Sequence, residues 1–235
     1  MIEIEHLSGS WGREDAITNV DLRLRNGVAY AVVGAEGAGK STLLDLIAGV
    51  LPAAGGMVTV SGYDLATRSR EAKRRIGYLP ASSPDFPDMT VYEFLAFVAA
   101  ARGVHGLKAE RQIRDAVALC GLEKVQDRLL RTLPEADRRR VGIAQTLPGD
   151  TETLLLDEPL SGLSPRMATT VLSILSSLKG KYTLVITTAD LSVLHGLCDR
   201  VICLEQGRVI SEEAIADETV PPETALPTDS EEVID

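Results

Sequence analysis

The sequence predicts an α/β fold: a mostly parallel β-sheet with helices on both faces, a small antiparallel β-subdomain and a helical subdomain. The first observation is an apolar run at residues 28–33, followed by a glycine-rich loop at 34–42 and a helical pattern at 43–48. The second is an apolar strand pattern at 153–156 that ends in two acids. The third is a series of helical patterns at about 82–150, which form an insert between predicted strands.

Length and composition favour a globular chain without a membrane span. With 235 residues and 45% hydrophobic residues, it can bury a substantial core. No apolar run reaches the roughly 18 residues of a spanning helix, and the alternating start of the chain does not resemble a signal peptide. Cys120, Cys198 and Cys203 lie far apart in apolar settings, which predicts buried thiols in a reducing compartment. We therefore expect a cytoplasmic protein.

The acidic charge is concentrated at one end of the sequence. Nine acids and no Lys or Arg follow Arg208, and without those nine the formal net charge of −10 becomes −1. Residues 211–235 are also proline-rich and lack periodicity, which predicts an acidic, disordered tail. The near-neutral remainder gives no indication of a nucleic-acid partner.

The predicted elements begin with two antiparallel strands, at 1–7 and 16–24, because both segments alternate apolar and polar residues. The loop between them, 8–15, contains Trp11, the only tryptophan. Its ring is either a partly buried packing group or a flat surface on which a base can stack.

The middle of the chain carries two short strands and then the helical insert. Gly55 and Gly56 are expected to interrupt the chain before a strand at 57–60, and Pro80 ends a strand at 76–79. Thr90 and Glu93 form the capping-box pattern of a helix start. The predicted helices are 94–101, 110–119, 122–130 and 138–147, the last with Asp137 as its N-cap.

The remaining elements continue the α/β pattern. We expect a strand at 153–158, a helix at 165–178, a buried strand at 182–188, a helical segment at 191–197, and a hairpin of 201–204 with 208–210.

The glycine-rich loop has the G-x4-G-K-[ST] pattern of a phosphate-binding P-loop in its required strand–loop–helix context. Glycines let the backbone fold around phosphates, and the helix N-terminus adds its dipole. Lys40 supplies a positive charge, and the Ser41 hydroxyl can ligate Mg²⁺. The candidate nucleotide-binding residues are Trp11, Gly34, Gly37, Ala38, Gly39, Lys40, Ser41 and Thr42.

The two acids after the strand at 153–156 complete the predicted chemistry. Asp157, at the strand's carboxyl end, can hold Mg²⁺ through water. Glu158 is placed to accept a proton from an attacking water, as a general base.

With these motifs, the chain resembles an ATP-binding subunit of an ABC transporter. Residues 34–42 and 154–159 are similar to the family's Walker A and Walker B motifs, and 161–165 resembles its D-loop. Segments 76–95 and 139–147 resemble exporters of the gliding-motility and nitrous-oxide-maturation type. The resemblance covers about residues 1–210, and Trp11 falls where the family has its adenine-stacking aromatic.

The resemblance implies the ABC ATPase fold, which has a P-loop NTPase core, and implies ATP and Mg²⁺ as ligands. It also implies a membrane-spanning transporter subunit and a second nucleotide-binding domain as partners. The chain would then lie on the inner face of the cell membrane.

Several family positions differ in this chain. The Q-loop glutamine falls on Ala81, the D-loop aspartate on Ser164 and the switch histidine on Ala189. His195, six residues further on, is more typical of a surface or core histidine than of a replacement. The signature motif, usually Leu-Ser-Gly-Gly-Gln, is Leu133, Pro134, Glu135, Ala136 and Asp137.

These differences predict ATP binding with weak or absent hydrolysis. Pro134 offers neither a hydroxyl nor an N–H to a phosphate, and Glu135 and Asp137 bring negative charge toward a polyanion. Losing one positioned donor typically costs about a hundredfold in rate. In a homodimer or a heterodimer, neither composite site is complete. Glu158 argues the other way, because an inactive site has no need of a base.

Two functions stay open. One is the ATP-binding subunit of an export complex, docked on a membrane protein through residues 81–88, with slow or partner-assisted hydrolysis. The other is a non-catalytic, nucleotide-binding structural or regulatory subunit of a membrane complex. A soluble ABC protein of the ribosome or chromosomes fits less well, because there is one ATPase domain, no coiled-coil insert and no basic surface.

Overall fold

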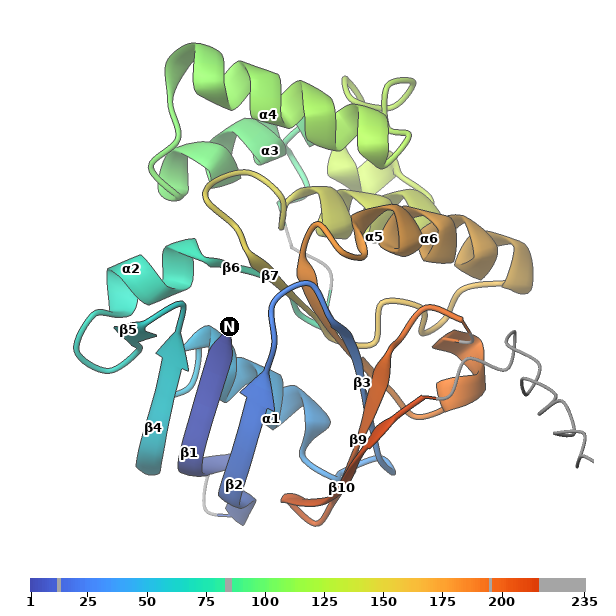
Figure 1. Ribbon diagram of the computed structural model, residues 1–235. Helices are drawn as coiled ribbons and strands as arrows, with labels where there is room; N and C mark the ends of the chain where they lie inside the picture. The colour runs from blue at the N-terminus through green and yellow to red at the C-terminus, as the bar shows by residue number, and fades with distance from the viewer. Residues whose placement is uncertain (12–13, 83–85, 195, 216–235) are drawn as a thin grey trace, which may run out of the picture.

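The computed structural model describes residues 1–11, 14–82, 86–194 and 196–215 (Figure 1). Its larger sheet has the strand order β10-β9-β3-β8-β7-β6. Every neighbouring pair is parallel except β10 with β9. The strands are β3 (Ala29–Val33), β6 (Ile76–Leu79), β7 (Thr153–Leu156), β8 (Thr183–Thr188), β9 (Arg200–Glu205) and β10 (Arg208–Ala214). This mostly parallel sheet confirms the predicted fold class.

The parallel strands are buried on both faces, as their continuous apolar runs predict. In β3, Tyr30 and Val32 face a core that includes helix α1 (Lys40–Ala48). Ala29 and Ala31 face the opposite core, which includes helix α6 (Pro165–Leu178). Helices therefore cover both faces of the sheet (Figure 1).

The smaller sheet is antiparallel, with the order β2-β1-β4-β5. Its strands are β1 (Ile2–Trp11), β2 (Glu14–Leu24), β4 (Gly55–Val60) and β5 (Tyr63–Asp64). The predicted loop at 8–15 is wrong, because β1 and β2 extend into it and three register shifts keep the strands paired. The predicted break at Gly55 and Gly56 is also wrong. A Cβ at Gly56 would lie 2.4 Å from the Glu5 carbonyl oxygen, so a glycine lets β4 approach β1.

The other helices are α2 (Ser69–Arg74), α3 (Val91–Ala101), α4 (Gly106–Leu119) and α5 (Glu135–Ala144). The capping box of α3 is confirmed: Thr90 Oγ1 accepts from the Glu93 N–H, and Glu93 Oε2 accepts from the Thr90 N–H. The predicted helix at 122–130 is wrong. The carbonyl oxygens of Gln126 and Arg128 accept from the first N–H groups of α3, and only a short 3₁₀ turn at Leu130–Thr132 follows.

The predicted N-cap of α5 is also wrong. Pro134 is the cap and Glu135 the first helical residue, three positions before the expected start. Asp137 lies in the first turn, where its carboxylate interacts favourably with the helix dipole and accepts a hydrogen bond from Arg140.

The C-terminal elements differ from expectation in two places. The segment 191–197 contains only a 3₁₀ turn at Leu191–Leu194, and His195 lies outside the described residues. Strand β10 continues to Ala214, so the first four residues of the expected tail belong to the sheet. Residues 216–235, which carry the rest of that prediction, are outside the described part.

Two further observations bear on the chain as a whole. No helix in the described ranges has the length and apolar character needed to cross a bilayer. Cys120 and Cys198 are buried and Cys203 is half-buried, and all three are free thiols.

Candidate functional site

The glycine-rich loop connects the end of β3 to the start of α1. A Cβ at Gly34 would lie 2.3 Å from the Leu204 carbonyl oxygen, so the loop passes β9 too closely for any other residue. Gly37 and Gly39 both have left-handed backbones, and Ala38 donates its N–H to the Ala35 carbonyl. The result is a tight loop that ends at the helix N-terminus.

Lys40 is buried beneath this loop. Its ammonium group donates to the carbonyl oxygens of Gly34 and Ala35, at 2.8 and 3.0 Å. The same group lies 3.8 Å from Glu158 Oε1. The loop therefore encloses a positive charge that is only partly balanced by one carboxylate.

The start of α1 is suited to an anion. Gly39 is its N-cap, and no side chain accepts a hydrogen bond there. The N–H groups of Lys40, Ser41 and Thr42 belong to the first turn and so have no acceptor within the helix. Unmatched N–H groups, the helix dipole and the lysine together form a phosphate-binding arrangement.

The two acids after β7 are joined through a threonine on the neighbouring strand. Thr187, in β8, donates its hydroxyl to Asp157 Oδ1 at 2.6 Å and accepts from the Glu158 N–H at 2.8 Å. Asp157 and Thr187 are both buried. Glu158 has a left-handed backbone with φ of 45°, which costs about 1 kcal/mol for a residue with a side chain. The hydrogen bonds of Thr187, at the end of β8, therefore hold both acids in place after β7.

Arg139 connects the same turn to α5. Its guanidinium donates to the carbonyl oxygens of Glu158 and Ser161, both at 3.3 Å. The side chain is 7% exposed, and its nearest carboxylate is Glu135 at 3.8 Å. Among the residues that the structure describes, nothing accepts from its buried Nε. A cation on α5 therefore holds the loop that carries Glu158.

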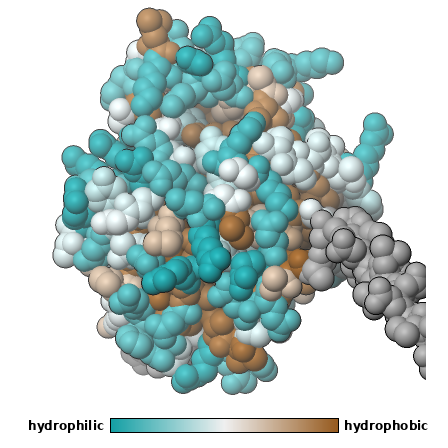
Figure 2. All heavy atoms as spheres, viewed as in Figure 1, coloured by the Kyte–Doolittle hydropathy of each residue, from teal (hydrophilic) through white to brown (hydrophobic). Residues whose placement is uncertain are grey.

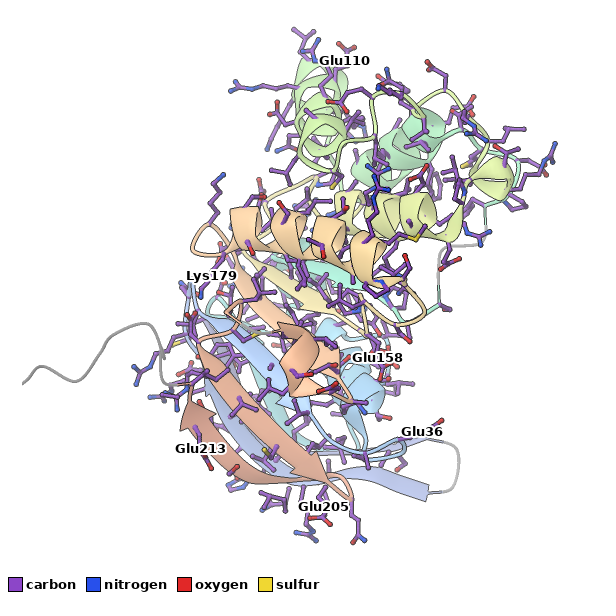
Figure 3. The ribbon with its side chains drawn as sticks, turned by 90° about the vertical axis from the view of Figure 1, so that its right-hand side faces the viewer. Glu36, Glu110, Glu158, Lys179, Glu205 and Glu213 are labelled. Carbon is purple, nitrogen blue, oxygen red and sulfur yellow. The ribbon has the colours of Figure 1, made fainter. Side chains whose placement is uncertain are left out.

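A cavity of about 180 Å³ opens beside Glu158, and Ala189 lies in its wall. Glu158, predicted to be a base, and Ala189, at the switch-histidine position, therefore line the same cavity. The methyl group of Ala189 can neither donate nor accept a hydrogen bond. Figure 3 shows Glu158 near the centre of the molecule and Glu36, from the loop, at its outer edge.

The other family positions lie at element ends. Ala81 is exposed after β6, beside the undescribed residues 83–85. Pro134 and Glu135 are exposed at the start of α5, where Ala136 is half-buried. Ser164 is the N-cap of α6 without a side-chain capping bond. Trp11 ends β1, but its side chain is outside the described part of the structure.

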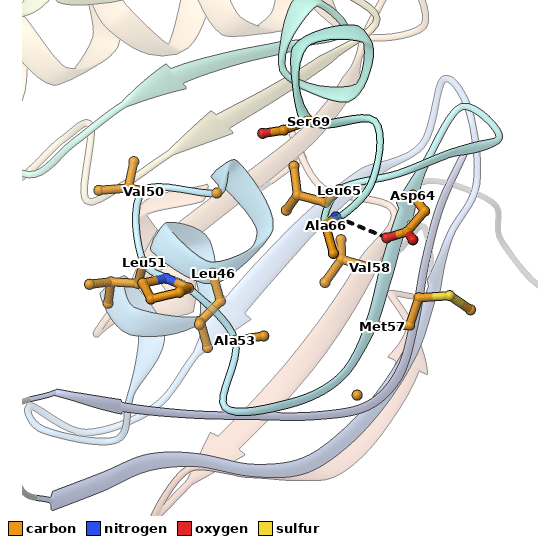
Figure 4. Close-up of a pocket in the computed structure, with 13 residues that line it drawn as sticks. Leu46, Val50, Leu51, Ala53, Met57, Val58, Asp64, Leu65, Ala66 and Ser69 are labelled. Atoms are coloured by element: carbon orange, nitrogen blue, oxygen red, sulfur yellow. Dashed lines mark hydrogen bonds between the residues drawn. The ribbon is translucent and has the colours of Figure 1, made fainter.

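A separate, mainly apolar hollow of about 400 Å³ lies between the end of α1 and strands β4 and β5 (Figure 4). Leu46, Val50 and Leu65 are among its lining residues, and the Ala66 N–H donates to Asp64 at its rim. It contains no residue of the glycine-rich loop, so it is not part of the phosphate-binding arrangement.

The fold and the loop define a P-loop nucleotide-binding protein. The profile of the ABC transporter family matches residues 17–161, more than half of the sequence. The chain therefore belongs to the ABC transporter family, as an ATP-binding subunit whose ligand is ATP with Mg²⁺.

Several curated relatives support this assignment. The linearmycin resistance ATP-binding protein LnrL of Bacillus subtilis is 28% identical over 213 residues, covering 90% of this chain and 68% of its own length. The methionine import ATP-binding protein MetN 1 of Paraburkholderia xenovorans is 32% identical over 232 residues, which cover 94% of this chain and 67% of the relative. An uncharacterized ABC transporter ATP-binding protein of Synechocystis is 31% identical over 89% of this chain and 60% of the relative. The chain thus spans 60–68% of these relatives' lengths.

Solved structures share the fold. An ATP-binding subunit of an ABC transporter superposes with a TM-score of 0.81 at 24% identity, over 92% of this chain and 90% of that one. The bacterial ABC transporter cassette MJ0796, solved as a dimer, superposes with a TM-score of 0.81 at 23% identity, over 91% and 98%.

Two residues of this site were missed by sequence reasoning. Thr187 is one of several threonines in an apolar strand, and only its register beside Asp157 distinguishes it. Arg139 is the middle of three consecutive arginines, and the helical period does place it on a different face from Arg138 and Arg140. That periodicity was the available signal.

Proposed function

We propose that this chain is the ATP-binding subunit of an ABC-type export complex, and that it binds Mg-ATP but hydrolyses it slowly or not at all. The observation that carries the proposal is the cavity beside Glu158, where Ala189 supplies no hydrogen-bonding group. The buried Lys40 and the uncapped start of α1 support the binding half of the proposal.

Different residues of the chain would bind the phosphates and the Mg²⁺ of the ligand. Lys40 and the first-turn N–H groups of α1 would bind the phosphates. The described residues contain no cluster of three or more acids, histidines or cysteines that could hold a metal alone. Mg²⁺ would therefore be held jointly by Ser41, by Asp157 through water, and by the nucleotide's own phosphates. When bound, Mg-ATP supplies a polarised γ-phosphate to the site.

Impaired hydrolysis follows from what faces the reacting atoms. With alanine at position 189, the cavity wall has no imidazole to hold an attacking water beside Glu158. Its other polar side chains are those of Ser161, Thr187, Thr188 and Asp190. At the start of α5, a partner's phosphate would meet the proline ring of Pro134 and the carboxylate of Glu135. Each missing donor costs about a hundredfold in rate.

The complex we propose contains a membrane-spanning subunit and a second nucleotide-binding domain, with the chain on the inner face of the cell membrane. The exposed aromatic rings of Phe86, Tyr92 and Phe97 lie in and next to the segment 81–88 expected to dock. The export direction rests on the resemblance of 76–95 and 139–147 to exporters. The names of the relatives include both linearmycin resistance and methionine import.

A second candidate is a purely structural or regulatory nucleotide-binding subunit. The 3.8 Å approach of Glu158 to Lys40 favours it, because a carboxylate that balances the P-loop lysine has a role without catalysis. Calorimetric titration with Mg-ATP tests the binding that both candidates share. We expect saturable binding that is lost in Lys40→Ala and kept in Lys181→Ala, an exposed lysine. Equal binding by Lys40→Ala would overturn the assignment of the site.

A further inference from the structure

A basic cavity lies on the molecule away from the glycine-rich loop. It is about 500 Å³ in volume and opens between α2 and the C-terminal end of α3. Four of its lining residues are cations, Arg70, Lys73, Arg74 and Arg102, and no carboxylate lines it. Helix α2 lies at the left in Figure 1, and the same side of Figure 2 is mostly hydrophilic.

The positive charges of this cavity are only partly balanced within the described structure: Arg70 is attracted to Glu71, and Arg102 to Asp150. The nearby carboxylates have closer partners outside the cavity: Glu71 pairs with Arg68 at 3.1 Å, Asp150 with Lys108 at 3.2 Å and Glu152 with Arg75 at 2.9 Å. Among the described residues, no carboxylate lies within ion-pair distance of Arg70, Lys73 or Arg74. A free anion or an acidic segment can therefore enter without displacing an existing pair.

Arg102 adds a second observation. Its terminal nitrogen donates to the Arg74 carbonyl oxygen and to Thr151 Oγ1. Its Nε is buried and has no acceptor in the described part of the chain. Burial also lowers the pKa of this guanidinium. Arg102 therefore contributes a half-buried positive charge to the wall of the cavity.

The topology places the start of the acidic segment at the same edge of the sheet. The Ile215 N–H donates to the Asp199 carbonyl, directly before β9, while Arg74 and Arg75 directly precede β6. Because β6 and β9 run in the same direction within one sheet, their starts share an edge. Five interstrand spacings separate β10 from β6, about 24 Å. The 20 residues from 216 to 235 can span up to about 66 Å.

We propose that residues 216–235 dock in this basic cavity of the same chain. They carry seven carboxylates and no Lys or Arg, which is the charge complement of the four cations. Attachment to the same chain gives the segment an effective concentration in the millimolar range. Since α2 follows the antiparallel sheet and α3 belongs to the helical insert, the docked segment would link these two parts. This proposal does not depend on ATP binding or hydrolysis.

Zero-length carbodiimide coupling in the full chain tests the proposal, because it joins only a lysine and a carboxylate in direct contact. Lys73 is the reporter in the cavity. Lys181 is the matched control: it is exposed and lies two residues from Lys179, which pairs with Asp199 beside the start of the segment. Products are mapped by mass spectrometry of the monomer. The variant Arg70→Glu/Arg74→Glu removes the cavity charge. The control Arg114→Glu/Arg166→Glu makes the same charge change at two exposed arginines that form no ion pair with any described residue.

We expect Lys73 to couple to residues 216–235 in higher yield than Lys181. We also expect that yield to fall about tenfold in about 1 M salt, where charges are screened within about 3 Å. The cavity variant should lose the product and the control variant keep it. Equal coupling at Lys181, or a Lys73 product unaffected by Arg70→Glu/Arg74→Glu, would overturn the proposal. It would also be overturned if Lys73 gave no product while the chain bound phosphatidylglycerol vesicles through these arginines, since the occupant would then be a lipid surface.

Discussion

The guanidinium of Arg139 donates to the carbonyl oxygen of Glu158, 3.3 Å away, and so joins α5 to the turn after β7. Pro134, at the signature position, is the N-cap of α5 and lies five residues earlier in the chain. The helix that carries the degenerate signature and the loop that carries the candidate base are therefore connected inside one chain. A displacement of α5 would therefore act directly on the Glu158 backbone through this hydrogen bond.

Arg139→Ala should destabilise the fold. The substitution removes two hydrogen bonds from a charged donor, to the carbonyl oxygens of Glu158 and Ser161, and hydrogen bonds to charged groups contribute about 1.5–3 kcal/mol. We expect the free energy of unfolding, measured by urea denaturation, to fall by about 2 kcal/mol or more. The matched control is Arg138→Ala, which removes a partly exposed pair with Glu135 and should cost less than about 1 kcal/mol. Similar losses in the two variants would contradict the structural role of Arg139.

Thr187→Val should weaken both stability and Mg-ATP affinity. Valine keeps the shape of the side chain but removes the hydroxyl that bonds to Asp157 and to the Glu158 N–H. An unsatisfied buried group costs about 1–3 kcal/mol of unfolding free energy. Thr187→Ser retains the hydroxyl and should lose less than half as much. If the serine variant is as destabilised as the valine variant, packing and not hydrogen bonding is the main contribution of Thr187.

The α/β class and the glycine loop could be predicted from the sequence because their signals are local. The segment 28–33 is a short apolar run, and it is followed directly by a glycine pattern that specifies its own loop geometry. Helix α6, with bounds that match the prediction, has Pro165 at its first position and a regular apolar period. Asp157 and Glu158 were found because they follow a buried strand.

The errors have long-range causes. Residues 122–130 lack a helix because their carbonyl oxygens accept from the start of α3, more than thirty residues away in sequence. Strand β1 continues to Trp11, and β2 begins at Glu14, because β1 pairs with both β2 and β4. The hydrogen bond of Thr187 likewise depends on which strand lies beside β7. No local pattern encodes these pairings.

Stability should fall at alkaline pH because of two buried thiols. Burial raises the pKa of both Cys120 and Cys198 to about 12, above the ordinary value of 9.0. The unfolded chain therefore loses these protons first as the pH rises above about 9. The stability these thiols provide is complete below pH 9 and is lost between about 9 and 12, at up to about 1.4 kcal/mol per pH unit for each thiol.

Denaturation midpoints measured between pH 8 and 10.5 check this prediction. The control is the double variant Cys120→Ala/Cys198→Ala, which should be less stable at neutral pH but show a shallower decline above pH 9. An unchanged slope in the double variant would show that other groups cause the alkaline loss.

The central claim is that this chain binds ATP without efficient hydrolysis. The most direct measurement is steady-state phosphate release from the purified full chain in saturating Mg-ATP, beside Glu158→Gln and Lys40→Ala. We predict that the unmodified chain releases phosphate no faster than Glu158→Gln, while calorimetry shows Mg-ATP binding to the unmodified chain but not to Lys40→Ala. Turnover well above background that Glu158→Gln abolishes would contradict the account, and would mean that Glu158 acts as a base despite Ala189 and Pro134.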